Sequence, residues 1–159
     1  MEFYKSSNVT FDDLRLFNYN NMKIGVIVHI VDNNGKILLQ QRGPKCQDDA
    51  LLFEDIGGKL EDSDIDFKSA IIREIKEEVG EDVIFDISNP VGIYHSEKGD
   101  VNWMFVIFIA KYIKGNLEIM EKEKCLGYDF FSYDDIINSN EVSNGSKFLT
   151  KSLRKEYNI

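Results

Sequence analysis

The sequence contains few of the residues that would mark a cross-linked or multidomain protein. Only two cysteines occur in 159 residues, Cys46 and Cys125, and they lack the spacing of a metal site or a disulfide framework. We interpret them as reduced thiols of a cytoplasmic protein. Only two prolines occur, neither at a domain boundary, and no internal repeat interrupts the chain. We therefore expect one domain over residues 1–159, with residues 1–21 as an N-terminal extension.

Long hydrophobic runs are also missing. The longest, residues 103–110, is far shorter than the ~20 residues of a membrane helix. The first five residues lack the basic region and apolar run of a signal peptide, so we expect no membrane partner. The net charge of −9 and the pI near 4.7 argue against general binding to nucleic acid. A phosphorylated small molecule remains compatible if a bound cation supplies positive charge. The sequence leaves open whether the chain forms a homodimer.

Periodic apolar residues predict a mixture of strands and helices. The expected strands cover residues 22–31, 36–42, 53–56, 83–87, 91–96, 101–113, 116–120 and 128–132. The expected helices cover residues 66–80, 134–138 and 146–157, with Ser146 as a possible cap of the last one. Residues 1–21 are polar, and their pattern does not decide between a short strand and a short helix. This order of elements is typical of an α+β or α/β sandwich.

The stretch from residue 57 to 80, GGKLEDSDIDFKSAIIREIKEEVG, concentrates the chemistry of the chain. On a helix, Glu74 and Glu78 share one face and Glu77 lies beside them. The neighbouring arc is apolar and carries Phe67, Ile71, Ile72, Ile75 and Val79. Arg73 can pair with Glu77 four residues later, but one arginine leaves an excess of negative charge. A hard divalent cation such as Mg²⁺ would balance that charge. The alternative is a solvated acidic face.

The ends of this helix also have sequence signals. Asp66 can cap the N-terminus, and Ile65 and Ala70 are placed as a hydrophobic staple. Gly80 is typical of the position just past a helix C-terminus.

The same stretch resembles the Nudix box, G-x5-E-x7-R-E-U-x-E-E-x-G-U, where U is a bulky aliphatic residue. The positions that match are Gly57, Gly58, Glu61, Arg73, Glu74, Ile75, Glu77, Glu78 and Gly80. The spacing from Gly58 to Arg73 is one residue longer than the pattern, so its first Glu falls on Asp64 or on Ile65. The final U is Glu81. We expect the extra residue to bulge the loop between Glu61 and Asp66 and to leave the helix register unchanged.

The resemblance implies an α/β fold: a Nudix-type α/β/α sandwich with a mixed β-sheet. It also implies a Mg²⁺-dependent pyrophosphohydrolase, with Mn²⁺ as an alternative metal. Glu77 and Glu78 are then the first-choice metal ligands, with the Gly57 carbonyl as a backbone ligand. Glu74 is a general base or an additional ligand, and Arg73 orients the carboxylates. In this interpretation the catalytic group is Glu74, Arg73 and Glu77.

A second segment, EKEKCLGYDFF over residues 121–131, is similar to the P-E-K-C-E-G-W-E-W-F segment of MutT-type Nudix proteins. Leu126 stands where that segment has a glutamate. The similarity favours a nucleoside triphosphate as substrate, which would yield a monophosphate and pyrophosphate. It also selects Glu121 as a further metal ligand, ahead of Glu118 and Glu123. The alternative for all three is a solvated loop charge.

The remaining candidates carry weaker signals. Arg42 and Lys59 are expected near the substrate phosphates, and Glu61 near substrate or a further metal. His29 is expected to be a core histidine, and His95 a surface one. Four aromatic residues could stack on a base or pack in the core: Tyr94, Trp103, Phe130 and Phe131. Other functions remain open, namely hydrolysis of ADP-ribose, a dinucleotide or RNA 5′ ends, or nucleotide sensing without catalysis.

Overall fold

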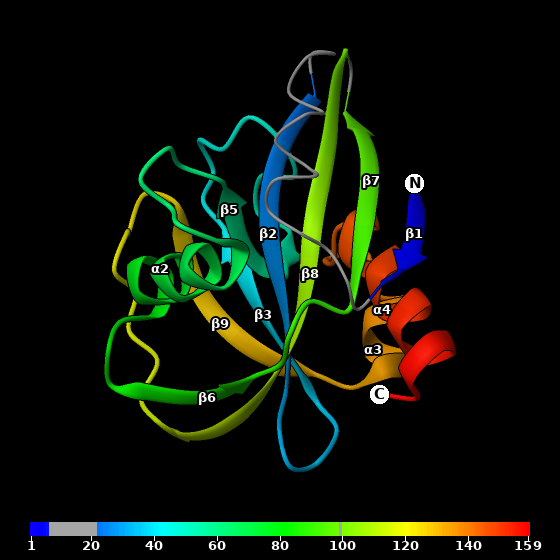
Figure 1. Cartoon of the computed structure of the whole chain (residues 1–159). Coiled ribbons are helices and arrows are strands. Elements are labelled where there is room, and N and C mark those ends of the chain that lie inside the picture. Colours follow the sequence, from blue (N-terminus) through cyan, green and yellow to red (C-terminus); the bar gives the residue numbers. More distant parts are fainter. Residues whose placement is uncertain (7–21, 99) are drawn as a thin grey trace.

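The computed structural model describes residues 1–6, 22–98 and 100–159. Nine strands of these residues join one mixed β-sheet. They are β1 (Glu2–Lys5), β2 (Met22–Val31), β3 (Ile37–Arg42), β4 (Phe53–Glu54), β5 (Ile56–Lys59), β6 (Val83–Ile87), β7 (Gly92–Lys98), β8 (Val101–Gly115) and β9 (Cys125–Phe131). The helices are α2 (Phe67–Val79), α3 (Tyr133–Asn138) and α4 (Asn144–Tyr157). Helix α2 covers one face of the sheet, and α3 and α4 lie on the other side (Figure 1).

Strands β2 and β8 form the centre of the sheet. They pair in parallel from Met22↔Asn102 to Val31↔Lys111, whereas the other strand pairs are antiparallel. Side chains alternate between the two faces of a strand. Val26 and Val28 therefore pack in the core under helix α2, while Ile27 packs against the core beneath α4. The long apolar β2 is buried on both faces because each face is covered by a helical layer.

Helix α2 begins and ends as its sequence predicts. Asp66 is the N-cap, and its side chain accepts a hydrogen bond from the Ser69 N–H at 2.7 Å. Gly80 ends the helix with a φ of 85°, which favours glycine. Asp64 lies outside the helix, and its N–H donates to the Glu61 carbonyl at 3.0 Å. The turn at residues 61–64 therefore absorbs the longer spacing, and the expected helix register is confirmed.

Several local expectations were wrong. Ile65 is 83% exposed, so it forms no staple with Ala70. Ile72, expected on the buried arc, is 38% exposed because it lies at the edge of that arc. Helix α4 is capped by Ser143 rather than Ser146, since the Ser143 hydroxyl accepts from the Ser146 N–H. The expected strand at residues 116–120 is irregular, because Glu118 N–H bonds to the carbonyl at the end of α2 instead of joining a ladder.

The N-terminal residues add an edge to the sheet. Strand β1 pairs with β7 in antiparallel register, from Glu2↔His95 to Lys5↔Gly92. The undecided pattern of residues 1–21 thus resolves to a strand at residues 2–5, and residues 7–21 lie outside the described part of the chain.

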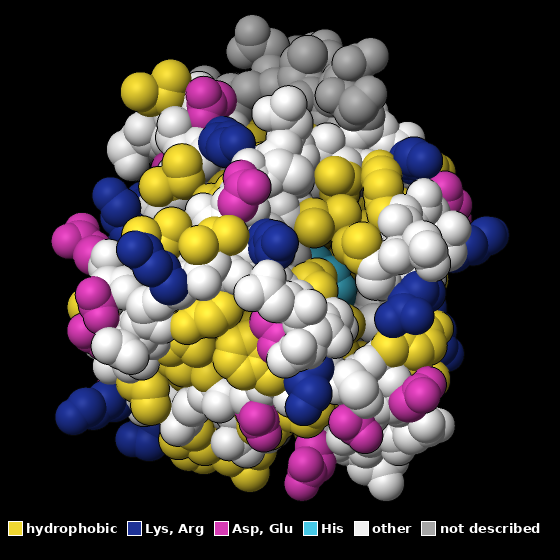
Figure 2. Space-filling view, turned by 90° about the horizontal axis from the view of Figure 1, so that it is seen from below, with side chains coloured by type: hydrophobic (Ala, Val, Ile, Leu, Met, Phe, Trp, Pro, Cys, Tyr) yellow, Lys and Arg dark blue, Asp and Glu magenta, His cyan; other side chains and the backbone are white. Residues whose placement is uncertain are grey.

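The surface is mixed in character. Acidic, basic and hydrophobic side chains all appear on the face shown in Figure 2. Within residues 1–6, 22–98 and 100–159, no helix is both long and apolar enough to cross a membrane. Cys46 and Cys125 are free thiols, in agreement with the prediction.

Candidate active site

The glycine pair of β5 brings the backbone close to helix α2. The strand expected here ended at residue 56, but Gly57 and Gly58 lie within β5 and pair with Ile27 and Val26 of β2. A Cβ atom on Gly58 would lie 2.3 Å from Glu74 Oε1. Only glycine leaves space for that carboxylate between strand and helix. The glycine pair at the start of the 57–80 stretch and the helical carboxylates near its end are therefore in contact.

Arg73 organises the acidic groups around this contact. Its guanidinium donates to Asp64 through Nε and Nη2, at 2.9 and 2.8 Å. Nη1 lies 3.0 Å from Glu74 Oε1, 3.1 Å from Glu77 Oε2 and 3.3 Å from Glu61 Oε1. The expected pairing with Glu77 is present, but the two-bond contact is with Asp64. The hydrogen bond from Arg73 lowers the pKa of Asp64.

Two glutamates of α2 are withdrawn from solvent. Glu74 is 7% exposed, and its burial raises the pKa of its carboxyl group. Burial raises the pKa of Glu78 to about 7, and the negative charges of Glu121 and Glu74 add to the effect. Glu77 differs from both, because its side chain is 44% exposed and pairs with Arg73. The described cluster thus combines a buried carboxylate, Glu74, with a half-buried one, Glu78, and a more exposed one, Glu77.

The segment before β9 places one further carboxylate near this cluster. Glu121 acts electrostatically on Glu78, and Lys124 Nζ donates to Glu121 Oε2 at 2.8 Å. Glu118 lines a separate depression with Lys76 and Glu81, among others. Glu121 thus acts electrostatically on Glu78, and Glu123 lines a cavity that Glu78 also lines. The choice of Glu121 as a metal ligand stays a prediction.

The oxygen atoms of this region match the preferences of a hard divalent cation. The candidate donors are the carboxylates of Glu74, Glu77, Glu78 and Glu121 and the Gly57 carbonyl. Buried carboxylates at close range repel one another, so a divalent cation would relieve that repulsion. Among the residues that the structure describes, no three acidic, histidine or cysteine side chains already converge as ligands. Arg73 instead holds Glu74 and Glu77.

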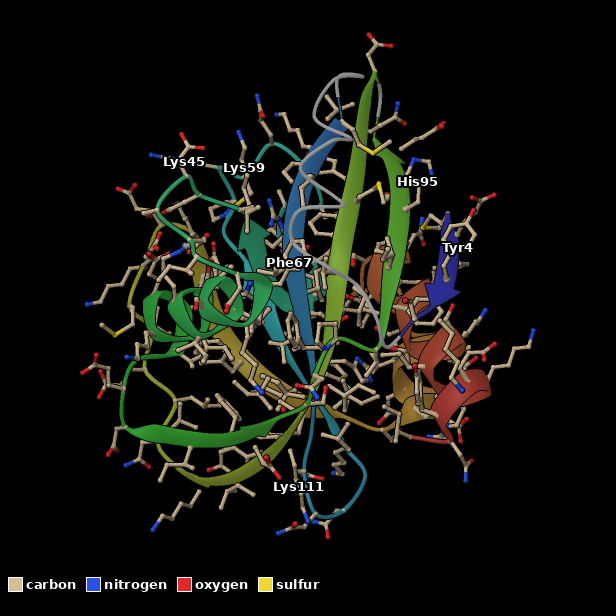
Figure 3. All side chains as sticks on the ribbon, viewed as in Figure 1. Tyr4, Lys45, Lys59, Phe67, His95 and Lys111 are labelled. Carbon is tan, nitrogen blue, oxygen red and sulfur yellow. The ribbon has the colours of Figure 1, made fainter. Side chains whose placement is uncertain are left out.

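Cavities continue from the carboxylate cluster across the sheet. The first is lined by Gln40, Arg42, Lys45, Cys46, Glu54, Gly57, Glu78, Glu123 and Lys124. The second shares Arg42, Glu54 and Gly57 with it and extends to Asp55, Lys59, Trp103 and Phe105. Their volumes are about 330 and 260 Å³, so the two joined cavities together reach the size of a small-molecule site. In Figure 3, Lys45 and Lys59 lie at the same end of the molecule, and His95 lies along β7.

The three residues predicted to lie near the substrate, Arg42, Lys59 and Glu61, differ in their positions relative to these cavities. Arg42 lines both and pairs with Glu54 at 2.5 Å. Lys59 lines the second cavity, and its carbonyl accepts a bond from Arg73. Glu61 is exposed and reaches Arg73 rather than a cavity wall. Arg42 and Lys59 thus lie where a polyphosphate could contact them, and Glu61 belongs to the arginine network.

The aromatic candidates divide into two groups. Trp103 lines the second cavity, and Tyr94 lines a third cavity that adjoins it. Phe130 and Phe131 instead pack against hydrophobic clusters of the core. His29 is fully buried, as expected of a core histidine.

Sequence reasoning missed several residues of this region. Asp64 appeared only as a motif position, yet it is the principal partner of Arg73. Glu54 and Asp55 line the cavities directly before β5. Two adjacent acids one residue ahead of the glycine pair were a usable signal, because they directly precede the stretch that carries the site. Gln40 could not have been found this way, since only the sheet register brings it opposite Glu54.

Comparison with known proteins gives a consistent result. A model of the NUDIX domain matches residues 22–151, while no curated protein matches the chain. The chain is similar to the crystal structure of a MutT protein from Methanosarcina mazei Go1, with 18% identity, a TM-score of 0.70, and coverage of 85% of this chain and 94% of that one. A MutT NUDIX hydrolase from Burkholderia pseudomallei has 20% identity, a TM-score of 0.67, and coverage of 82% and 96%. The solution structure of the E. coli ORF135 protein has 23% identity, a TM-score of 0.63, and coverage of 86% and 94%. The expected α/β/α sandwich is confirmed.

Proposed function

This chain belongs to the Nudix family of hydrolases, and from this premise we propose that it is a Mg²⁺-dependent pyrophosphohydrolase of nucleotides. Its substrates are nucleoside diphosphates linked to another group, foremost ribo- and deoxyribonucleoside triphosphates. These would yield a nucleoside monophosphate and pyrophosphate. The observation that carries the proposal is that Glu78, on the same helix face as Glu74, lines the first cavity, which shares Arg42 with the second cavity, lined by Lys59 and Trp103.

The reaction breaks a P–O–P linkage with water. A water oxygen bonds to one phosphorus, the bond from that phosphorus to the bridging oxygen breaks, and the leaving phosphate keeps the electron pair. Glu74 is buried beside the glycine strand and is the proposed proton acceptor or an additional metal ligand. Arg73 holds the Glu74 and Glu77 carboxylates in position. Arg42 and Lys59 supply positive charge for the phosphates.

Glu77 and Glu78, the Gly57 carbonyl and Glu121 are the residues that would hold Mg²⁺. When bound, the ion would neutralise phosphate charge, lower the pKa of bound water and stabilise the leaving phosphate. Mn²⁺ has the same preference for oxygen ligands and is an alternative.

The test is phosphate and pyrophosphate release over a panel of nucleotides, ADP-ribose and dinucleotides with and without Mg²⁺. Glu78→Gln keeps the side-chain volume and removes the charge, so turnover should fall about a hundredfold or more while the fold persists. Glu77→Gln should act in the same direction. Glu81→Gln is the matched control, because Glu81 is an exposed glutamate just beyond the same helix.

Near-wild-type turnover in both Glu77→Gln and Glu78→Gln would overturn the assignment of these ligands. Release from ADP-ribose or a dinucleotide with no release from triphosphates would replace the proposed substrate class. Nucleotide binding without any metal-dependent release would instead indicate a sensor.

A further inference from the structure

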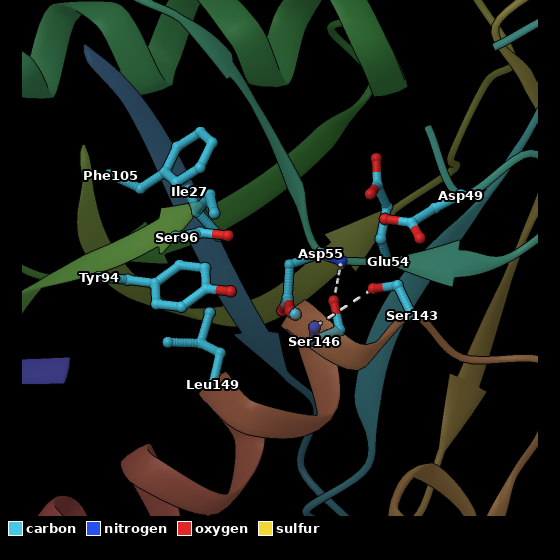
Figure 4. Close-up of a pocket in the computed structure, with 11 residues that line it drawn as sticks. Ile27, Asp49, Glu54, Asp55, Tyr94, Ser96, Phe105, Ser143, Ser146 and Leu149 are labelled. Carbon is cyan, nitrogen blue, oxygen red and sulfur yellow. Dashed lines mark hydrogen bonds between the residues drawn. The ribbon is translucent and has the colours of Figure 1, made fainter. Parts of the chain in front are cut away.

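A third cavity lies between the sheet and helix α4, beyond the region assigned to the phosphates. It has a volume of about 70 Å³. Its walls include Ile27, Glu54, Asp55, Tyr94, Phe105 and Ser146 (Figure 4). Ile27, Glu54, Asp55 and Phe105 also line the second cavity. The two cavities therefore meet at these residues.

Asp55 is unusual among the residues that line this cavity, because one of its carboxylate oxygens has no hydrogen-bond partner. The residue is 6% exposed, and its side chain 3%. Oδ1 lies 2.9 Å from His29 Nδ1, whereas Oδ2 is buried without a hydrogen-bond partner. A buried acceptor without a donor costs free energy, which a ligand's N–H group would recover. Asp55 thus points to a ligand with a hydrogen-bond donor.

The surroundings hold this carboxylate in one orientation. Oδ1 lies 2.9 Å from His29 Nδ1 and accepts a hydrogen bond from it in the tautomer that carries the ring proton on Nδ1. The Asp55 N–H donates to Ser146 Oγ at 2.8 Å, which ties the backbone of the residue to helix α4. Figure 4 shows the Asp55 and Tyr94 side chains extending toward the same part of the cavity. Oδ2 is consequently the oxygen left for a ligand.

The outer side of the junction is aromatic. Trp103 and Phe105 are partly exposed, and their rings stack with a centroid distance of 5.0 Å and an interplanar angle of 3°. Gly25 permits this arrangement, because a Cβ atom there would lie 2.7 Å from the Phe105 ring. Phe105 also stacks on Tyr94 at 6.1 Å, and Lys23 Nζ lies 5.5 Å from the Trp103 ring centroid, so these rings form a packed aromatic wall of the cavity. A planar apolar ring with an N–H donor on its edge therefore suits both this wall and Asp55.

We propose that Asp55 is a specificity-determining residue that selects nucleotides whose base carries an exocyclic amino group. This inference rests on the proposed nucleotide substrate. Cytosine, adenine and guanine each offer an amino group as donor, and an acidic side chain accepts from such a group. At the position of that amino group, uracil and thymine carry a carbonyl oxygen, and so does hypoxanthine in comparison with adenine. In comparison with guanine, hypoxanthine carries a C–H there, and neither group donates a hydrogen bond to the carboxylate as an amino group does. The carboxylate thus favours the first set and disfavours the second.

The wild-type protein tests this selection with pairs of nucleotides that differ at an amino position. The pairs are dCTP with dUTP, dATP with dITP, and dGTP with dITP. We expect kcat/KM to favour the amino member of at least one pair by about tenfold or more, the effect of one charge-assisted hydrogen bond. Calorimetric titration with the α,β-imido analogues, which resist cleavage, should show the same preference in Kd.

Asp55→Asn sharpens the test because His29 controls the orientation of the new amide. The Asn oxygen stays toward His29 Nδ1, so the NH₂ group takes the place of Oδ2 and donates toward the ligand. The preference should fall by about tenfold, or invert toward the keto member in the dCTP–dUTP and dATP–dITP pairs. Asp86→Asn is the matched control, since Asp86 is an exposed aspartate on β6, away from the cavities. It should keep the wild-type ratios.

Equal kcat/KM and Kd within about twofold for all three wild-type pairs would overturn the selection, and this readout needs no variant to fold. An Asp55→Asn protein that folds and keeps the wild-type ratio would overturn it as well. If no nucleotide is hydrolysed but the analogues still bind with the amino preference, the proposed reaction fails and the selection by Asp55 stands. Hydrolysis without any preference would instead leave the proposed reaction standing and overturn the selection.

Discussion

Arg73 is the residue on which the acidic groups of the site depend most. It contacts four carboxylates, and its side chain is only 19% exposed. The strongest geometry is the pair of bonds to Asp64, a residue that belongs to the loop rather than the helix. One guanidinium therefore ties the loop to the helix that carries Glu74 and Glu78.

Asp64→Asn should lower the free energy of unfolding by about 2 kcal/mol, because it removes the charge opposite a largely buried arginine. Urea unfolding at neutral pH measures the loss. Asp62→Asn is the control, since Asp62 is exposed in the same loop. An Asp64→Asn protein as stable as the control would contradict the role given to this pair.

The same pair predicts a pH dependence. The pKa of Asp64 is lowered in the folded protein, so its stabilisation is fully present above the unfolded pKa of about 4. It is lost as the pH falls through the folded pKa. The stability difference between wild type and Asp64→Asn should therefore shrink in acid, and a difference that stays constant would argue against an ionised Asp64.

Strand β5 and helix α2 position the site as a unit. Gly58 provides the close approach, and Glu74 occupies the space that a side chain at position 58 would need. Gly58→Ala would displace the flexible end of Glu74 while leaving the backbone of β5 in place. We expect the turnover to fall at least tenfold, with a change in unfolding free energy of under about 1 kcal/mol.

Gly127→Ala is the matched control for Gly58→Ala. A Cβ atom on Gly127 would meet no atom within 4 Å, and its φ is not positive. Both variants are compared by steady-state kinetics and urea unfolding. Wild-type turnover in Gly58→Ala would show that the contact between β5 and Glu74 does not matter for the reaction.

The N-cap of α2 should make its own measurable contribution to the free energy of unfolding. Asp66→Ala removes the acceptor for the Ser69 N–H and should cost about 1 kcal/mol of stability. Asp66→Asn retains an acceptor and should lose much less. Thermal unfolding of the two variants separates the hydrogen bond from other effects of the substitution, and equal losses would assign the effect to charge alone.

At the scale of the whole molecule, the stability of the fold should depend on both pH and Mg²⁺, because the Glu78 carboxylate is partly withdrawn from solvent. Burial raises the pKa of Glu78 to about 7, so its unfavourable charge is absent below the unfolded pKa and fully present above about pH 7. Without Mg²⁺, this group should destabilise the fold as the pH rises. A cation that binds only the folded state raises the melting temperature by mass action.

The increase in melting temperature on addition of Mg²⁺ should therefore grow between about pH 5 and about pH 8. Differential scanning calorimetry measures it. Glu78→Gln should remove most of the increase at the higher pH, while Glu81→Gln should retain it. An Mg²⁺ effect that is equal in both variants would place the cation elsewhere.

The sequence by itself determined the features that depend on neighbours along the chain. The spacing of residues 66–80 defined helix α2, with its cap at Asp66 and its end at Gly80, because helix geometry places residues three and four apart on one face. The same spacing put Glu74 and Glu78 together. The apolar runs of β2 and β8 likewise predicted central strands, since both of their faces are buried.

Only the tertiary structure decided which distant residues meet. The register of β3 brings Gln40 opposite Glu54, and the packing of α4 places Ser146 against Asp55. No local period encodes such contacts, because they depend on how strands pair and on how layers stack. The Asp64–Arg73 bonds and the His29–Asp55 pair are of this kind. Local spacing predicted the helix and its carboxylates, and long-range packing supplied the cavity that they face.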